Sequence, residues 1–309
     1  MTLNVIIENF VAVDCEVSTV QRTSDDVEKS EIFTTPNAWG VLVGNGHPYV
    51  LQNAISFLRE TAEIDLPQLM INLERHLQLR EDKSFRDYLA GVEDRIRTKH
   101  SLVPDQEKRE VMIAEEYGSE VTRLYDGSIN SPAGELYVIA YDNKMNKLKK
   151  SGLTCRKNGV FGEIDLVHTL AAGSGGDIAG AYLSTQTSGV DWKKITDEFK
   201  FYLTALACAT ATANKGVGGF MGVVIVDQDG ARYVEPQRVN AAVRVCGKQV
   251  AGDISKREAM VMAGDIFNGK ASYFTIARDL GITKEDLLYA PCRVHQDVSR
   301  FNAMLTLSK

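Results

Sequence analysis

The stretch AAGSGGDIAGAYL, residues 171–183, places a run of glycine and serine directly before an apolar, helix-like segment. Gly173, Ser174 and the two glycines that follow suggest a loop that cradles phosphate. A Walker-type loop, however, needs lysine and then serine or threonine after its last glycine, and here Asp177 follows. The dinucleotide pattern GxGxxG also fails, because GSGGDI lacks the third glycine. What remains is a helix N-terminus beside a serine hydroxyl, an arrangement that can orient a nearby charged group.

The composition is that of an ordinary globular protein. The chain has 309 residues, of which 44% are apolar and 25% are charged, so it can form one large domain or two small ones. Its net charge of -6 argues against a nucleic-acid partner, which usually needs a clustered basic face. The longest basic cluster, residues 144–150, is short, which favours a solvated turn over a phosphate site. We therefore expect no nucleic-acid partner.

The residue types that bind metals are scattered along the chain. The five cysteines show no CxxC spacing, which fits a reducing compartment and neither a zinc site nor a disulfide framework. The five histidines form no HxxxH or HxH pair, so we expect no metal and no other cofactor. The chain opens with no signal segment and contains no run of roughly 18 apolar residues. We expect a cytoplasmic protein with no membrane partner.

Apolar periodicity predicts the order of the elements. Residues 2–20 are rich in β-branched residues and are broken only at Glu8-Asn9, which predicts a β-hairpin. Elsewhere, apolar spacings of three and four predict helices, and β-branched or alternating runs predict strands. In the first half of the chain, a second hairpin with its turn at Pro36-Asn37 is predicted at 31–46. Strands are predicted at 110–118 and 134–143, with a short pair of strands around 153–161, and helices are predicted at 49–60, 66–79 and 85–98.

In the second half, helices are predicted at 177–186 and 197–216, and a pair of strands joined by an Asp-Gly turn is predicted at 218–234. The chain thus runs strands, helices, strands, helices, strands. This is an α+β pattern without βαβ alternation. We expect two antiparallel sheets between helical layers, with 2–46 and 134–235 supplying the strands.

Residues 236–309 read as an appendage with apolar clusters that need a surface to cover. Helices are predicted at 256–267 and 283–290. Ser255 and Thr283 are each followed three residues later by an acidic residue, which is typical of helix N-caps. The appendage covers either its own domain or a neighbouring subunit, and we favour the neighbour.

Several short motifs, taken in order, resemble the N-terminal-nucleophile hydrolases. The motifs are MTLNVII, FVAVD, DVEKSEIF, WGVLVGNG, LAAGSGGDIAGAYL and GVGGFMGVVIVDQDG. Over residues 2–235 they resemble a diverged proteasome β subunit or the related bacterial peptidase of the ATP-dependent heat-shock protease. The resemblance implies a four-layer αββα sandwich over 1–235, with an α-helical C-terminal extension at 236–309. It also implies a peptide or protein substrate and self-association into a ring or larger homo-oligomer.

Carried over position by position, the resemblance assigns a catalytic threonine. Thr2 would be the nucleophile once Met1 is removed, and its freed α-amine would act as general base toward the threonine hydroxyl. Asp14, at the end of the second predicted strand, matches the position of the active-site acid. Lys29 would lower the pKa of the nucleophile through its charge.

The resemblance assigns two further positions. The backbone N–H of Gly44 matches the oxyanion-hole position. Ser174 would hydrogen-bond near the amine, so the glycines would bring this serine and a helix N-terminus up to the catalytic group. Asn214 and Val217 depart from the pattern, because the family usually has an acid and a serine there. The sequence therefore leaves open a catalytically inactive assembly or scaffold subunit of the same fold, and, more weakly, a small-molecule amidase.

The candidate residues can also be explained without catalysis. Asp14 and Lys29 can form an ordinary ion pair at a strand end. Gly44 can simply permit the turn into the following helix, and Ser174 can be the N-cap of a helix.

The register of the first hairpin bears on these alternatives. A three-residue turn over 7–9 would place Thr2 opposite Asp14 on the same face. A two-residue turn at Glu8-Asn9 would send them to opposite faces, because side chains alternate along a strand.

Overall fold

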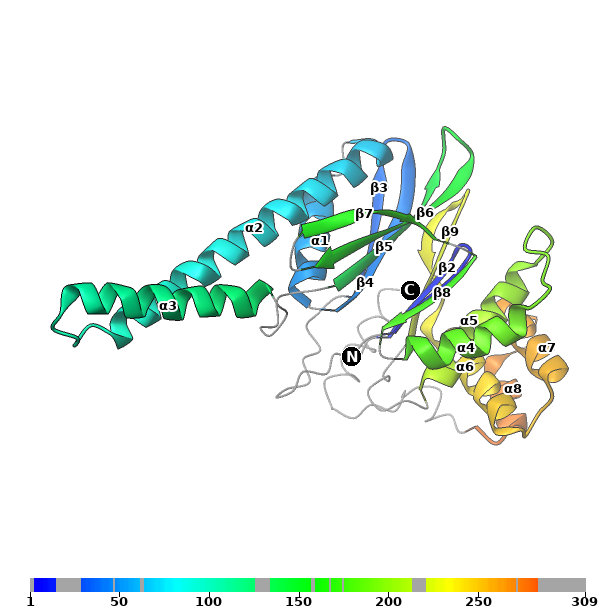
Figure 1. Ribbon diagram of the computed structural model, residues 1–309. Coiled ribbons are helices and arrows are strands. Elements are labelled where there is room, and N and C mark those ends of the chain that lie inside the picture. The colour runs from blue at the N-terminus through cyan, green and yellow to red at the C-terminus, as the bar shows by residue number, and fades with distance from the viewer. Residues whose placement is uncertain are drawn as a thin grey trace.

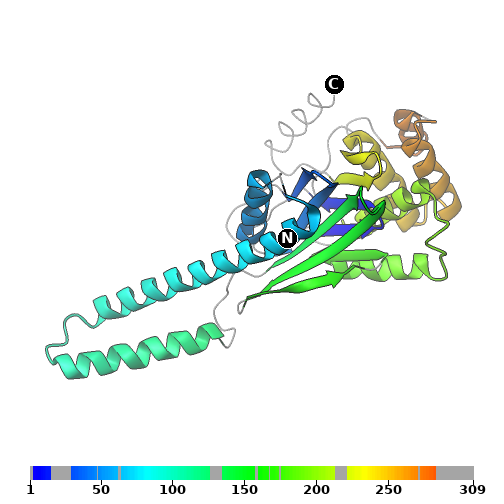
Figure 2. The same ribbon diagram turned by 90° about the horizontal axis from the view of Figure 1, so that it is seen from above.

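The structure of the protein, a computed structural model, describes residues 3–14, 29–46, 48–61, 64–125, 134–156, 159–166, 168–173, 175–212, 221–270 and 272–282. This part of the chain is α+β and contains two antiparallel sheets together with helices, as predicted (Figure 1). Figure 2 shows that two long helices project from the rest of the molecule.

The two sheets are each built of five strands. The first sheet has the order β10-β9-β2-β1-β8 and the second has the order β3-β4-β5-β6-β7. In the first sheet the strands are β1 (Leu3–Ile7), β2 (Phe10–Asp14), β8 (Thr169–Gly173), β9 (Met221–Asp227) and β10 (Gly230–Tyr233). In the second sheet they are β3 (Ser30–Thr35), β4 (Ala38–Gly46), β5 (Gly134–Asp142), β6 (Lys147–Arg156) and β7 (Gly159–Asp165).

One face of each sheet packs against the other sheet. Alternate residues of β1, β2 and β9 meet alternate residues of β4 and β5 in a buried apolar cluster. Its members are Ile6, Val11, Val13, Val41, Val43, Tyr137, Ile139, Val224 and Val226. The period of two along each strand therefore divides its side chains between this inter-sheet core and the opposite face.

The opposite faces are covered by helices. On the first sheet, Leu3, Val5 and Phe10 share a core with α4 (Gly176–Thr187), α5 (Asp197–Ala211) and the helices that follow. On the second sheet, Leu42 and Leu136 pack with α1 (Pro48–Glu60) and the first part of α2 (Leu66–Lys99). Figure 1 shows the two groups of helices on opposite sides of the pair of sheets.

The predicted helices 66–79 and 85–98 are one continuous helix, α2, so their separation was wrong. The residues between them, REDKS, are polar and interrupt the apolar pattern. They include strong helix formers and neither glycine nor proline, so nothing in this stretch ends the helix. With 34 residues, α2 is about 51 Å long at 1.5 Å per residue.

The strand predicted at 110–118 was also wrong, because α3 (Gln106–Tyr125) is a helix. The run VMIA resembles a strand, but it lies within charged residues and buries only Ile113, against Val92 and Ile96 of α2, with the partly buried Tyr117. Asp105 caps the helix by accepting the N–H of Lys108 at 3.1 Å. A helix that packs against a single partner helix needs only a few apolar residues, spaced at i and i+4, on the face that meets this partner.

The Gly-rich stretch that opens α4 is shaped by close packing. A Cβ on Gly176 would lie 2.9 Å from the carbonyl oxygen of Ala171, so glycine lets the helix begin tight against β8. Gly173 has a φ of 88°, a conformation that favours glycine. The N-cap residue of α4 is Gly175, which makes no side-chain cap hydrogen bond, and Ser174 lies outside the described residues.

The described part of the C-terminal region is helical and packs on the rest of the chain. It consists of α6 (Pro236–Ala251), α7 (Lys256–Phe267) and α8 (Tyr273–Asp279). Ser255 and Glu258 form a capping box at the start of α7, which confirms that predicted cap. Val239, Val245 and Ile266 are buried in the same cluster as Phe201 of α5. The predicted helix 283–290 and its cap Thr283 lie outside the described residues.

Candidate functional site

A buried ion pair lies where β1 begins and β2 ends. The Nζ of Lys29 is 2.8 Å from Oδ1 of Asp14, and the side chains are 5% and 0% exposed. The same Asp14 oxygen accepts the backbone N–H of Leu3 at 2.9 Å. Asp14 belongs to the first sheet and Lys29 directly precedes the first strand of the second, so the pair bridges the two sheets.

The electrostatics of this pair reflect its burial. Burial raises the pKa of the Asp14 carboxyl above its usual value, and the Lys29 ammonium and the Leu3 N–H oppose that rise only in part. Buried ion pairs contribute little net stability, since removing two charges from water costs about as much as their attraction returns. A buried pair at a strand end is therefore more informative about function than about folding.

The strand register brings other parts of the predicted site to the same end of the first sheet. Leu3, which directly follows Thr2, pairs with Gly173, which directly precedes Ser174. Asp14 pairs with Met221 on its other side. Thr2 and Ser174 themselves lie outside the described residues, so their roles stay predictions.

Gly44 lies at the corresponding end of the second sheet. Ser30 pairs with Val43, and extending this register by one residue sets Gly44 opposite Lys29. A Cβ on Gly44 would lie 2.7 Å from Cδ2 of Leu136 and 2.9 Å from the carbonyl oxygen of Glu135. Packing therefore requires glycine at 44, whereas the positive φ needed for the turn toward α1 occurs at Gly46, where φ is 94°. Whether the N–H of Gly44 serves an oxyanion stays a prediction.

The first hairpin has a two-residue turn at Glu8-Asn9, since Ile7 pairs with Phe10. Glu8 has a φ of 53° and is held by Lys150, whose Nζ donates to Oε2 at 3.0 Å, and by His168. In this register Asp14 follows Phe10 and Ala12 on the helix-covered face of the first sheet, and Ile6 faces the second sheet. Of the two registers considered from the sequence, this is the one that separates the faces of residues 2 and 14.

Polar groups that the sequence did not single out lie close by along the strands. Asn4 of β1 is fully buried, and neither its amide nitrogen nor its amide oxygen has a hydrogen-bond partner among the described residues; the same holds for Oδ2 of Asp14. Native structures rarely leave such groups unpaired. The only sequence signal was one asparagine inside an otherwise apolar strand.

A second polar cluster follows Gly44 in the second sheet. Asn45 pairs with Glu135 across the β4–β5 ladder, and its Nδ2 donates to Oε2 of Glu135 at 3.1 Å. The hydroxyl of Tyr137 donates to the same carboxylate. Burial, and then the Glu135 carboxylate, raise the pKa of Tyr137 above its usual value, so this phenol stays protonated.

The thiol of Cys208, on which the charge of Asp14 acts, is unsuited to be a nucleophile. Burial, with a smaller contribution from the charge of Asp14, raises the pKa of Cys208 to about 12. A thiol rather than a thiolate is therefore present at neutral pH. Cys155, Cys208 and Cys246 are buried and free of disulfides, while the other two cysteines lie outside the described residues.

In the described ranges, no group of three or more His, Cys, Asp or Glu side chains is placed to hold a metal ion. Among the described helices, none combines the length and the apolar character needed to cross a bilayer.

Comparisons with known proteins find similar structures but no similar sequences. No protein-family model matches the chain, and no curated protein matches it. Among solved structures, the chain is similar to Anbu, an ancestral beta-subunit, from Yersinia bercovieri, with a TM-score of 0.48 and 11% identity over 82% of this chain and 96% of that chain. Anbu from Hyphomicrobium sp. strain MC1 has a TM-score of 0.47 and 12% identity over 84% of this chain and 97% of that chain. The helical assembly of the Anbu complex from Pseudomonas aeruginosa has a TM-score of 0.48 and 11% identity over 82% of this chain and 93% of that chain. With overlap and identity this low, function has to follow from the residues of the site.

Proposed function

We propose that this chain is a proteasome-like threonine hydrolase that cleaves amide or peptide bonds, with the four-layer αββα fold of the N-terminal-nucleophile hydrolases. The single observation that carries the proposal is the buried Asp14–Lys29 pair that bridges the ends of the two sheets. The pairing of Leu3 with Gly173 supports it, because this pair adjoins both Thr2 and Ser174 in the chain.

In the proposed reaction, removal of Met1 exposes the α-amine of Thr2. This amine takes the proton from the threonine hydroxyl as the oxygen attacks the carbonyl carbon of the substrate. The Lys29 ammonium favours the ionised oxygen, and Asp14 holds Lys29 in place. The N–H of Gly44 stabilises the negative charge that forms on the carbonyl oxygen. The proton then passes to the leaving amine, and water hydrolyses the resulting ester.

The alternative, an inactive assembly or scaffold subunit, is favoured by one specific observation. The two-residue turn at Glu8-Asn9 assigns Asp14 to the helix-covered face of the first sheet. This is the turn that, from the sequence, was expected to send Thr2 and Asp14 to opposite faces. Catalysis would then require that Lys29, which reaches Asp14 from the second sheet, also reach the hydroxyl.

Self-association into a homo-oligomer is also part of the proposal. Helix α5 offers no surface for it, since residues 201–211 are all buried within the chain. Of the exposed large apolar side chains in the described residues, four lie on α2, α3 and their connection, among them Leu79 at 58%, Leu102 at 92% and Val111 at 52% exposed. We propose that these two helices contribute to the interface between copies, since exposed apolar side chains gain from being covered. Light scattering at micromolar concentration should give a particle larger than one chain.

We also propose that the C-terminal extension, which begins after residue 235, covers its own domain rather than the neighbouring subunit favoured from the sequence. The first described helix of the extension, α6, buries Val239 and Val245 in the core that contains Phe201. A chain truncated after Glu235 would expose this apolar surface to water. We therefore expect the truncated chain to be insoluble, whereas a soluble truncated chain would show that the extension is dispensable for the core.

The function is tested by hydrolysis of a panel of fluorogenic peptides. Wild type should release the fluorophore, Thr2→Ala should be inactive, and Thr2→Ser should keep part of the activity because serine supplies the same hydroxyl. A folded wild type without activity on any peptide, or a Thr2→Ala variant as active as wild type, would overturn the hydrolase and leave the scaffold subunit. A melting curve for each variant separates loss of activity from loss of folding.

A further inference from the structure

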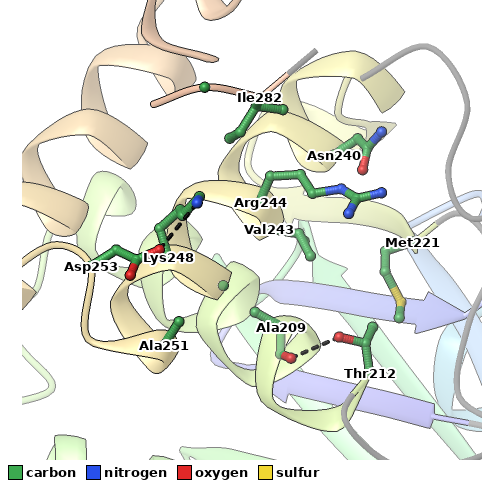
Figure 3. Close-up of a pocket in the computed structure, with 12 residues that line it drawn as sticks. Ala209, Thr212, Met221, Asn240, Val243, Arg244, Lys248, Ala251, Asp253 and Ile282 are labelled. Atoms are coloured by element: carbon green, nitrogen blue, oxygen red, sulfur yellow. Dashed lines mark hydrogen bonds and ion pairs between the residues drawn. The ribbon is translucent and has the colours of Figure 1, made fainter. Parts of the chain in front are cut away.

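A pocket of about 450 Å³ lies on the helix-covered side of the first sheet, between α5, α6 and the start of β9 (Figure 3). Its apolar wall is formed by Ala209, Met221, Val243 and Ile282. Pockets of about 300–1,000 Å³ with a few polar groups are typical of sites for small organic ligands.

The polar side of the pocket comes from α6. Asn240, Arg244 and Lys248 follow one another at intervals of four residues and so lie on one face of this helix. Lys248 is engaged, because its Nζ is 3.1 Å from Oδ2 of Asp253. Figure 3 shows Arg244 pointing away from this pair, toward Asn240. Within the described ranges, Arg244 has no hydrogen bond or ion pair, so its guanidinium is open to a ligand.

The floor of the pocket is open at Gly247. A Cβ built on this residue would meet no atom within 4 Å, although the residue lines the pocket. Space is therefore available beside α6, one helical turn from Val243 and Ala251.

We propose that this pocket binds an organic monocarboxylate, with the carboxylate on Arg244 and the apolar chain along Ala209, Val243 and Ile282. The guanidinium presents paired N–H donors that match a carboxylate. An inorganic anion would gain nothing from the apolar wall, and a neutral ligand would leave Arg244 unpaired. Because Asp253 already holds Lys248, Arg244 is the cation left for a ligand among the described lining residues, and it can pair with one carboxylate. The carboxylate can be that of a free aliphatic acid or the C-terminus of an apolar peptide.

Calorimetric titration of the full chain at pH 7 tests the proposal and separates the two sources. The probes are octanoate and an N-acetylated peptide of three leucines with a free carboxylate, each compared with its amide. Saturable binding of octanoate would identify a free aliphatic acid as the ligand. Binding of the peptide but not of octanoate would identify a peptide C-terminus as the ligand. Each amide should bind at least about tenfold more weakly, since it lacks the charge-assisted hydrogen bonds. If neither acid binds to the folded protein, or if the amides bind as tightly, the proposal is overturned.

Three variants locate the binding. Arg244→Gln should lower the affinity for the acid by about tenfold or more. Gly247→Leu should abolish binding, because its side chain fills the open space. The matched control is Arg257→Gln, which removes the same charge from an exposed position on α7 and should leave binding unchanged. Replacing glycine inside a helix favours the helix, so Gly247→Leu should keep its melting temperature. Wild-type affinity in Arg244→Gln would contradict the assignment, and this variant decides the test if Gly247→Leu does not fold.

Discussion

The two-sheet body and the helical arm, residues 80–125, place their charged side chains in opposite environments. In the body, the Asp14–Lys29 pair is almost fully enclosed at the end of two sheets whose faces are covered by apolar clusters. In the arm, two helices run side by side out of the body (Figures 1 and 2), and few apolar residues join them. Their ion pairs, such as Arg97–Glu93 and Lys99–Glu116, are half-exposed. Placing or removing one exposed charge in the arm changes the free energy of unfolding little. Removing one partner of the buried pair leaves the other charge enclosed and lowers the free energy of unfolding strongly.

The largest effect is expected from breaking the buried pair. Lys29→Met would leave the Asp14 carboxylate enclosed without its cation and should lower the free energy of unfolding by about 3 kcal/mol at pH 7. The loss should shrink toward acid pH. Burial raises the pKa of Asp14, so the stability that its protonated form contributes is complete below the usual pKa of 3.8 and is lost as pH rises through the folded value.

Urea unfolding of Lys29→Met at pH 4.5 and pH 7 measures this difference. The double variant Asp14→Asn with Lys29→Met is the control, since it removes both charges and should recover part of the loss. Equal losses in the single and double variants would show that the pair is not electrostatically coupled.

The next effect is local to the arm. Ile113→Ala removes one of three fully buried apolar side chains between α2 and α3 and should cost about 2 kcal/mol. Because so few contacts join the arm to the body, hydrogen exchange should accelerate in residues 85–125 and remain unchanged in β1, β2 and α5. Acceleration throughout the chain would show instead that arm and body unfold as one unit.

Glycine-to-alanine changes should have opposite signs in the two regions. Gly44→Ala places a Cβ against Leu136 and the backbone of Glu135, which should cost about 1 to 2 kcal/mol. Gly91→Ala, in α2, meets no atom within 4 Å and should stabilise the helix by about 0.5 to 1 kcal/mol. Thermal melting of the two variants compares them directly, and destabilisation of similar size in both would remove the distinction between packed body and open arm.

The smallest effect concerns a carboxylate of the arm. Hydrogen bonds from Lys99 and then His100 lower the pKa of Glu116 below its usual value of 4.5. The stability that this carboxylate contributes is therefore present above pH 4.5 and is lost as pH falls through the lowered value. Glu116→Gln should remove this pH dependence of exchange in α2 and α3, while Glu115→Gln, which removes a neighbouring exposed charge, should preserve it. If exchange in the two variants depended on pH in the same way, the contact of Glu116 with Lys99 and His100 would be contradicted.

The elements predicted from local periodicity are largely those of the structure. The hairpin β1–β2, the helices α4 and α5, and the capped helix α7 were all predicted, since each depends on residues close in sequence. The single helix α2 and the helix α3 were missed, because a solvent-exposed helix needs little apolar pattern.

The candidate site was predicted only in part, for a physical reason. The sequence suggested that Asp14 and Lys29 act together, and they are in contact. It did not give the hairpin register, because two- and three-residue turns were both compatible with the same residues. Nor did it reveal Asn4, which has no side-chain hydrogen-bond partner among the described residues and whose burial depends on a sheet formed with residues 169–173, far along the chain.

The central claim, that Thr2 is an N-terminal nucleophile supported by Asp14 and Lys29, is tested most directly by intact mass. The purified protein is measured before and after incubation with a peptide β-lactone, which acylates nucleophilic hydroxyls. We predict a starting mass short by one methionine residue and a single adduct, localised by fragmentation to Thr2 and absent from Lys29→Met. A starting mass that includes Met1, or an adduct at any other residue, would contradict it.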